Sequence, residues 1–209
     1  AGLPKEWVTM VAPENLDLAT ALVSDERVGF FSFIGSSGVG WMLRSKLAPG
    51  ARCALEHGGV APVIVASDAD LDTALLSLAK GGFYHAGQVC VSVQRIFCDK
   101  KIAQDVADGL ATLADNMKVS DPTLPDTDVG PLINHNECER VANWVSEAIS
   151  GGANLVTGGE KISDSCYKPT VLFDPPADAK ISTAEIFGPA VCVYPYDDLD
   201  SAISRAKSL

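Results

Sequence analysis

Cys90 is the residue of this sequence best suited to act as a nucleophile. It closes the segment Gly87-Gln88-Val89-Cys90, which lies between an expected helix and an expected strand. A cysteine in a loop is open to reagents, and a helix end or nearby dipoles can favour its nucleophilic thiolate form. The alternative is a small buried apolar residue, which most cysteines are. His85, shortly before Cys90, could form a Cys–His dyad with it, although a surface or structural role is the commoner case for a histidine.

Glu56 is a second candidate for chemistry. It lies in the segment Leu55-Glu56-His57-Gly58-Gly59, ahead of an apolar run at 62–66. An acid between an apolar residue and a Gly-Gly turn can serve as a general base. The alternative is a solvated loop acid, which is the commoner case.

Two further segments have residue types suited to a nucleotide. In Gly35-Ser36-Ser37-Gly38-Val39-Gly40, backbone N–H groups at a helix N-terminus would suit a phosphate, and Ser36 could donate to it or merely cap the helix. The glycine spacing fits neither the dinucleotide fingerprint nor a P-loop, so a tight turn without a ligand is an equal alternative. Glu185 could hold ribose hydroxyls and Phe187 could pack on a flat ring, although a plain turn explains that segment as well.

Short apolar runs alternate with stretches of helical periodicity along the chain. Strands are expected at 28–34, which should be buried, and at 62–66, 95–98, 155–157, 170–173 and 190–194. Helices are expected at 41–46, 71–78, 102–113, 138–149 and 199–206, with a loop at 120–131. This alternation predicts an α/β fold with a mostly parallel sheet flanked by helices.

The composition argues against several function classes. The 209 residues include 27 acidic residues against 16 Lys and Arg, a net charge of −11, which disfavours nucleic acid and anionic membranes as partners. The sequence has no apolar run long enough to span a membrane. Its six cysteines and three histidines show no metal-ligand spacing. We therefore expect no metal site, reduced thiols and a cytoplasmic location.

Taken in order, these segments resemble the aldehyde dehydrogenase superfamily. The segments that carry the resemblance are 35–40, 55–59, 68–72, 87–90 and 185–189, with Phe33-Ile34-Gly35-Ser36, Gly130-Pro131-Leu132-Ile133 and Lys168-Pro169-Thr170-Val171 as further matches. The separation of Glu56 and Cys90 is the family's spacing between general base and nucleophile. His57 stands where the family usually has Leu, which puts the polarity around Glu56 in question.

The resemblance implies that an aldehyde is oxidised to a carboxylic acid with NAD or NADP. Cys90 would attack the aldehyde carbon to give a thiohemiacetal, and its backbone N–H would form part of the oxyanion hole. Hydride transfer would leave a thioester, and Glu56 would activate the water that hydrolyses it. Two other functions stay open: an acyl-phosphate or acyl-CoA reductase, against which Glu56 argues, and a non-catalytic protein that has kept the fold.

The resemblance also implies the cofactor site. Gly35, Ser36 and Gly40 would lie at the pyrophosphate, Glu185 would hold the nicotinamide ribose, and Phe187 would pack near the nicotinamide.

Two domains follow from the same resemblance. Residues 1–57 would be the C-terminal part of a dinucleotide-binding domain, and 58–209 would be the catalytic, thiol-bearing domain. Since family members are much longer, we expect this chain to be a fragment with little activity alone. The complete protein would be a homodimer or homotetramer. Which aldehyde is used stays open, as does the choice between NAD and NADP.

Overall fold

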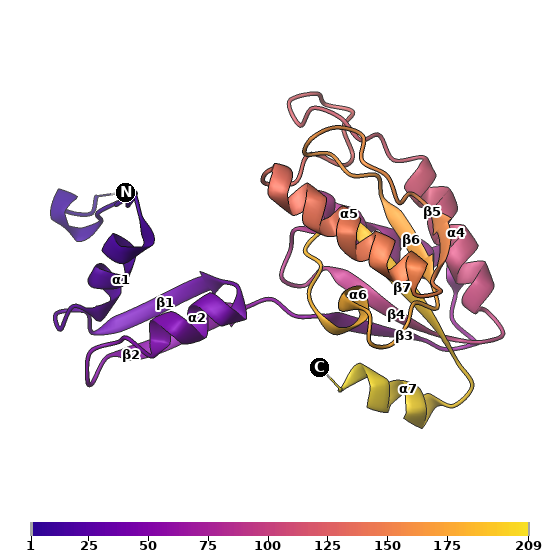
Figure 1. Cartoon of the computed structure of the whole chain (residues 1–209), viewed down its shortest axis with the longest axis horizontal. Helices are drawn as coiled ribbons and strands as arrows, with labels where there is room; N and C mark the ends of the chain where they lie inside the picture. Colours follow the sequence, from indigo (N-terminus) through magenta and orange to yellow (C-terminus); the bar gives the residue numbers. More distant parts are fainter. Residues whose placement is uncertain (1, 209) are drawn as a thin grey trace. The chain divides into compact units, whose positions relative to one another are not determined.

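The computed structural model describes residues 2–208 and divides the chain into two compact units, Ala1–Gly58 and Gly59–Leu209. The larger unit is built on a five-stranded sheet flanked by helices, with α5 in front of the sheet in the view of Figure 1. Its strands, in spatial order, are β3 (Ala61–Val65), β4 (Val93–Asp99), β7 (Ala190–Tyr196), β6 (Thr170–Phe173) and β5 (Asn154–Thr157). All neighbouring pairs are parallel except β5 and β6. The predicted α/β fold with a mostly parallel sheet is confirmed.

Helices connect the strands of the larger unit. They are α3 (Leu71–Phe83), α4 (Ala103–Asp115), α5 (His135–Ser150), α6 (Lys180–Thr183) and α7 (Leu199–Ala206), with a 3₁₀ turn, η2 (Tyr84–Gly87), directly after α3. Side-chain caps mark three of the helix starts. Asp70 accepts the Thr73 N–H at 3.4 Å, Asn134 accepts the Glu137 N–H at 3.0 Å, and Asp198 caps α7 in the same way. Each cap satisfies a backbone donor that has no partner within the helix.

The two central strands, β4 and β7, carry the core. Nearly every residue of both strands is buried, as expected for parallel strands that are covered on both faces. The rings of Phe97 and Tyr194, on neighbouring strands, stack with their centroids 5.2 Å apart. Cys98 and Cys192 lie among these residues, and burial raises the pKa of each thiol to about 12. The chain's six cysteines are all free thiols.

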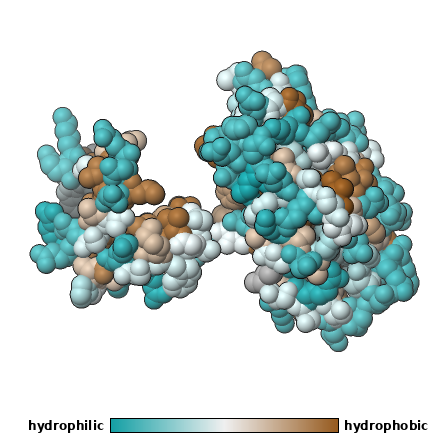
Figure 2. All heavy atoms as spheres, in the orientation of Figure 1, coloured by the Kyte–Doolittle hydropathy of each residue, from teal (hydrophilic) through white to brown (hydrophobic). Residues whose placement is uncertain are grey.

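The smaller unit consists of η1 (Lys5–Trp7), α1 (Leu16–Ser24), β1 (Phe30–Gly35), α2 (Ser37–Arg44) and β2 (Arg52–His57). Strands β1 and β2 pair in parallel and form a sheet of two strands. Among residues 2–58, only Gly40 and Leu43 are buried. Figure 2 shows apolar patches on the visible face of this unit.

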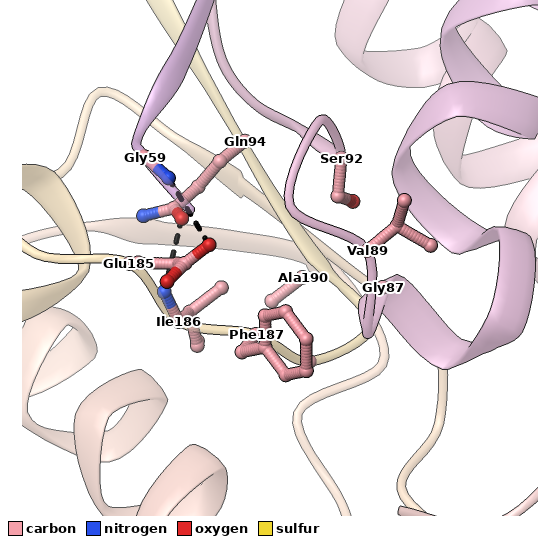
Figure 3. Close-up of a pocket in the computed structure, with 10 residues that line it drawn as sticks. Gly59, Gly87, Val89, Ser92, Gln94, Glu185, Ile186, Phe187 and Ala190 are labelled. Atoms are coloured by element: carbon pink, nitrogen blue, oxygen red, sulfur yellow. Dashed lines mark hydrogen bonds between the residues drawn. The ribbon is translucent and has the colours of Figure 1, made fainter. Parts of the chain in front are cut away.

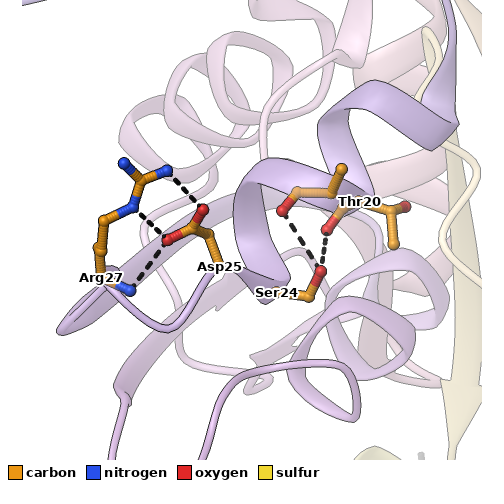
Figure 4. Close-up of polar contacts among 5 residues, drawn as sticks. Thr20, Ser24, Asp25 and Arg27 are labelled. Carbon is orange, nitrogen blue, oxygen red and sulfur yellow. Dashed lines mark hydrogen bonds and ion pairs between the residues drawn. The ribbon is translucent and has the colours of Figure 1, made fainter.

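Short-range polar contacts end α1 and turn the chain toward β1 (Figure 4). The Ser24 hydroxyl donates to the Thr20 carbonyl at 2.9 Å. Asp25 then accepts the backbone N–H and the Nε of Arg27 at 2.9 and 2.7 Å. These contacts with Arg27 hold the pKa of the Asp25 carboxyl well below its usual range.

The structure corrects several expectations about the smaller unit. The strand expected at 28–34 forms, but it is not buried by the described residues: Phe30 is 56% and Ile34 81% exposed, because within residues 2–208 it pairs with β2 alone. Strand β2 was not predicted, so Glu56 lies on a strand and not in a loop. Helix α2 begins at Ser37, four residues before the helix expected at 41–46, and α1 was not predicted.

In the larger unit, the short α6 was also not predicted. No helix within residues 2–208 is long and apolar enough to cross a membrane.

Candidate active site

Cys90 lies on an exposed turn between α3 and β4. The chain leaves α3 through η2, where His85 and Ala86 have φ values of 48° and 56°. A hydrogen bond of 2.9 Å from the Ser92 N–H to the Val89 carbonyl closes the turn around Cys90. The Cys90 thiol is therefore open to a reactant. The alternative of a buried structural cysteine is wrong for this residue.

Gln88 ties this turn to a distant loop. Its amide nitrogen donates to the carbonyls of His85 at 3.1 Å and Pro131 at 3.2 Å. Its amide oxygen accepts the Ile133 N–H at 2.9 Å. The segment Gly130–Ile133, noted in the sequence only for its resemblance, thus braces the turn that carries Cys90.

A second turn, between α6 and β7, carries Glu185 and Phe187. The Glu185 carboxylate accepts the Gly59 N–H at 3.2 Å. Half-burial raises the pKa of Glu185, and the Gly59 hydrogen bond and the nearby Arg140 charge oppose that rise. Phe187 has a φ of 45°, an uncommon conformation for a residue with a side chain, and the residue is 39% exposed. Such strain is held only where the surroundings fix it.

The two turns meet at Gly87 and Gly188. A Cβ added to Gly87, whose φ is +70°, would lie 2.0 Å from the Gly188 carbonyl oxygen, so only glycine allows this approach. A small hollow lies beside the contact (Figure 3). Its lining residues are Gly59, Gly87, Val89, Ser92, Gln94, Glu185, Ile186, Phe187, Gly188 and Ala190. Val89, the neighbour of Cys90, thus shares one hollow with Glu185 and Phe187.

The glycine-rich turn lies in the smaller unit, between β1 and α2. Gly35 has a φ of +156°, and a Cβ there would come within 2.7 Å of the Phe33 ring. Ser36 is the N-cap residue of α2, but its side chain makes no capping hydrogen bond. Its hydroxyl therefore has no observed role in closing the helix, which leaves it free to donate to a ligand at this N-terminus.

Glu56 and His57 occupy neighbouring positions on β2, opposite Ile34 and Gly35 of β1. The His57 ring lies against α2: a Cβ on Gly40 would come within 2.3 Å of His57 Cε1. Both ring nitrogens are buried without a hydrogen-bond partner. Because successive strand residues point to opposite faces, Glu56, which is exposed, faces away from the imidazole.

The possible Cys–His dyad finds no support. The ring of His85 lies against the ring of Tyr84, with centroids 3.8 Å apart and ring planes inclined by 49°, and no hydrogen bond joins it to Cys90 in the part of the chain that the structure describes. The described residues also contain no cluster of His, Cys, Asp and Glu that could hold a metal ion.

Comparison with known proteins identifies the family. The sequence profile of the "Aldehyde dehydrogenase family" matches residues 1–208. The chain belongs to the aldehyde dehydrogenase family. It is 37% identical over 207 residues to 3-sulfolactaldehyde dehydrogenase from Priestia megaterium, an alignment that covers 99% of this chain and 43% of the relative.

Solved aldehyde dehydrogenase structures share the fold of this family member. Aldehyde dehydrogenase 21 from Physcomitrella patens, in complex with the reaction product succinate, superposes with a TM-score of 0.88 at 32% identity, over 94% of this chain and 40% of that one. Glyceraldehyde-3-phosphate dehydrogenase from Methanocaldococcus jannaschii, complexed with NADP, gives a TM-score of 0.86 at 37% identity, over 91% and 41%. The chain thus spans about two-fifths of the length of the proteins it matches.

Within this aldehyde dehydrogenase chain, the predicted site residues are divided between the units. Cys90, Glu185 and Phe187 belong to the larger unit, where the Gly87–Gly188 contact joins their turns. Gly35, Ser36, Gly40 and Glu56 belong to the smaller unit. Sequence reasoning missed three residues that hold these turns: Gln88, Gln94 and Arg140. Only Gln88 gave a signal, because it lies next to the candidate cysteine.

Proposed function

We propose that this chain is the thiol-bearing part of an enzyme that oxidises an aldehyde to a carboxylic acid with NAD or NADP. One observation carries the proposal. The exposed Cys90 lies on a turn that packs through Gly87 against the turn of Glu185 and Phe187. A nucleophile and two groups suited to a nucleotide therefore belong to one rigidly packed pair of turns. Family membership supplies the reaction class.

Cys90 starts the proposed reaction. Its thiolate attacks the aldehyde carbon, which forms a C–S bond and places negative charge on the former carbonyl oxygen. The Cys90 backbone N–H donates to that oxygen and stabilises the charge. When the C–H electron pair leaves as hydride, the oxygen regains its double bond and Cys90 carries a thioester. NAD or NADP, when bound, accepts this hydride.

Glu56 completes the proposed cycle as a general base. Its carboxylate removes a proton from a water molecule, the water oxygen attacks the thioester carbon, and the Cys90 thiolate leaves. Glu56 is exposed on β2 and faces away from His57, so its carboxylate is open to solvent. This step yields the carboxylic acid and argues against the alternative of an acyl-phosphate or acyl-CoA reductase, which needs no such base.

The residues present fit a nicotinamide dinucleotide. The N-terminus of α2, with the uncapped hydroxyl of Ser36 and the turn glycines Gly35 and Gly40, suits the pyrophosphate. The half-buried Glu185 accepts the Gly59 N–H through one carboxylate oxygen, and its other oxygen can accept ribose hydroxyls. The partly exposed ring of Phe187 can pack beside the nicotinamide.

Domain roles and assembly are part of the same proposal. Residues 1–57 would end a dinucleotide-binding domain and residues 58–209 would form the catalytic domain, and the boundary of the two compact units supports this division. The complete protein would be cytoplasmic, in line with its free thiols, and a homodimer or homotetramer. Light scattering on the complete protein would measure its assembly.

The test is an assay of the complete protein that contains this chain. NAD and NADP reduction would be followed with uncharged aliphatic, aromatic and anionic aldehydes. We expect turnover with at least one class, on the order of 1 s⁻¹ or faster. Acyl phosphates and acyl-CoA with reduced cofactor serve as the comparison. Turnover of these alone would favour the reductase, and no turnover in either direction would favour a non-catalytic protein.

A further inference from the structure

We propose that Gln94 and Arg140 are positioning residues that set the Glu185–Phe187 turn for the nucleotide. This inference rests on the proposed function, because it assumes that Glu185 and Phe187 contact a nicotinamide cofactor. Neither residue belongs to a segment that carried the resemblance. Gln94 lies on β4, downstream of Cys90, and Arg140 lies on α5.

The side-chain amide of Gln94 forms three hydrogen bonds with the backbone of residues 181–186. Its nitrogen donates to the Ile181 carbonyl at 2.7 Å and to the Ala184 carbonyl at 2.8 Å. Its oxygen accepts the Ile186 N–H at 3.0 Å. The two carbonyls belong to the end of α6, where helix carbonyls lack partners of their own. Only an amide offers two donors and an acceptor in this arrangement.

Arg140 binds the other backbone polar group of Ile186, its carbonyl oxygen. Its Nη2 donates to the Ile186 carbonyl at 2.6 Å. The guanidinium is itself fixed, since its Nε donates to Glu137 at 2.8 Å and its carbon lies 4.8 Å from the Trp144 ring centroid. An arginine held at three points cannot drift from the carbonyl without breaking the other contacts.

Ile186 is thus clamped through both of its backbone polar groups. Its side chain is only 2% exposed, so the residue is fixed by packing as well. Glu185 and Phe187 flank it on either side and line the hollow (Figure 3). The clamp accounts for the strained φ of Phe187, which needs such support to persist.

The clamp acts through Ile186 and not through a ligand. Gln94 also lines the hollow, but it is 3% exposed and its donors and acceptor are all engaged with backbone. It therefore has no free N–H to offer a nucleotide, and its burial keeps the amide away from a ligand. Loss of the Gln94 amide should therefore loosen Glu185 and Phe187. The turn of Cys90 should stay in place, because Gln88 braces it.

The experiment compares Gln94→Met with Gln104→Met in the complete protein. Both exchanges replace an amide by a thioether of similar length, but Gln104 is an exposed residue of α4 whose amide nitrogen donates to the neighbouring Asp108 carboxylate at 2.9 Å. The readouts are the Kd of NADH by fluorescence titration, the rate of Cys90 alkylation by iodoacetamide without cofactor, and the KM and kcat for NAD or NADP.

For Gln94→Met, we expect the Kd of NADH and the cofactor KM to rise roughly tenfold, because ordering the loosened turn opposes binding. The alkylation rate should stay within about twofold of wild type, because a thiol on an undisturbed turn keeps its reactivity. Gln104→Met should change none of these values. An unchanged Kd in a folded Gln94→Met protein, or an alkylation rate that falls together with binding, would overturn the proposal.

Arg140 provides the second variant, which keeps the test decisive if Gln94→Met does not fold. Arg140 is only partly buried on α5, and Arg140→Met should also weaken NADH binding, by about threefold to tenfold. Arg140→Lys should restore part of the loss, because its ammonium can still donate to the Ile186 carbonyl. Equal binding by wild type and Arg140→Met would overturn the clamp.

Failure of the proposed function would look different from failure of the clamp. In that case the wild-type protein itself would neither bind NADH nor oxidise an aldehyde. If wild type does both and the two variants match it, the clamp alone is wrong.

Discussion

Both units of the chain contain strongly apolar strands, but these strands are buried in the larger unit and largely exposed in the smaller one. In the larger unit, apolar strands β4 and β7 have neighbours on both sides and helices over them, and almost all of their residues are buried. In the smaller unit, β1 is equally apolar, but among residues 2–58 its sole pairing partner is β2, and most of it is exposed. Burial is decided by the number of partners an element finds, and the apolar pattern alone does not reveal that number.

The same contrast separates the candidate site residues. Cys90, Glu185 and Phe187 are carried by turns that pack on a closed core. Glu56 and the glycine-rich turn are carried by a sheet of two strands, which has little independent stability. We therefore expect changes in the two units to affect chemistry and stability differently, and four predictions test this difference.

The largest effect is expected for Cys90→Ser in the larger unit. Loss of the thiolate removes the covalent route, so steady turnover should fall by roughly 10³-fold or more. The burst of reduced cofactor in the first turnover should vanish with it. Single serine replacements of Cys53 or Cys166 serve as controls and should leave turnover mostly intact. Normal activity in Cys90→Ser would end the assignment of the nucleophile.

Glu56→Gln in the smaller unit should separate two steps that Cys90→Ser removes together. Without a base, hydrolysis of the thioester slows, and steady turnover should drop by about 10²- to 10⁴-fold. The pre-steady-state burst of reduced cofactor should survive, because Cys90 still attacks the aldehyde. Stopped-flow absorbance measures both quantities. If the burst disappears as well, Glu56 serves an earlier step such as activation of the thiol.

Stability should also distinguish the units. Leu172 on β6 is fully buried, and Leu172→Ala should lower the free energy of unfolding of the larger unit by about 2–5 kcal/mol through lost packing and a cavity. Leu22 on α1 is largely exposed, so Leu22→Ala should change stability by no more than about 0.5 kcal/mol. Urea unfolding followed by circular dichroism would compare them. Equal effects would contradict the difference in burial.

A more gradual loss of stability is expected for the larger unit at alkaline pH. Burial raises the pKa of Cys98 and Cys192 to about 12, well above the value of an unfolded thiol. Between about pH 9 and pH 12 the native state keeps protons that the unfolded state has lost. Stability must therefore fall as the pH rises, by up to about 1.4 kcal/mol per pH unit for each thiol.

Urea unfolding at a series of alkaline pH values would measure this slope. Cys98→Ala and Cys192→Ala should each flatten it. A slope that is the same in the wild type and both variants would show that the buried thiols are not its source.

Local sequence patterns were sufficient to predict most of the helices and strands of the larger unit. Helix periodicity and caps such as Asp70 and Asn134 act within a few residues, so α3, α4, α5 and α7 could be predicted with the strands between them. The position of Cys90 in an exposed turn was also predictable, since Gly87 and the change of pattern around it are local features.

Three features were decided only by the tertiary structure. These are which strands are buried, the formation of β2, and the residues that support the turns of the site. β2 became a strand because β1 pairs with it, although its own residues, Arg52–His57, carry no clear strand pattern. Gln94 and Arg140 reach Ile186 across 92 and 46 residues of sequence. Contacts of that span arise when the chain folds strands β4 and β7 side by side and lays α5 near the turn that precedes β7. No local rule encodes such a meeting, because the partners are brought together by the packing of the whole sheet.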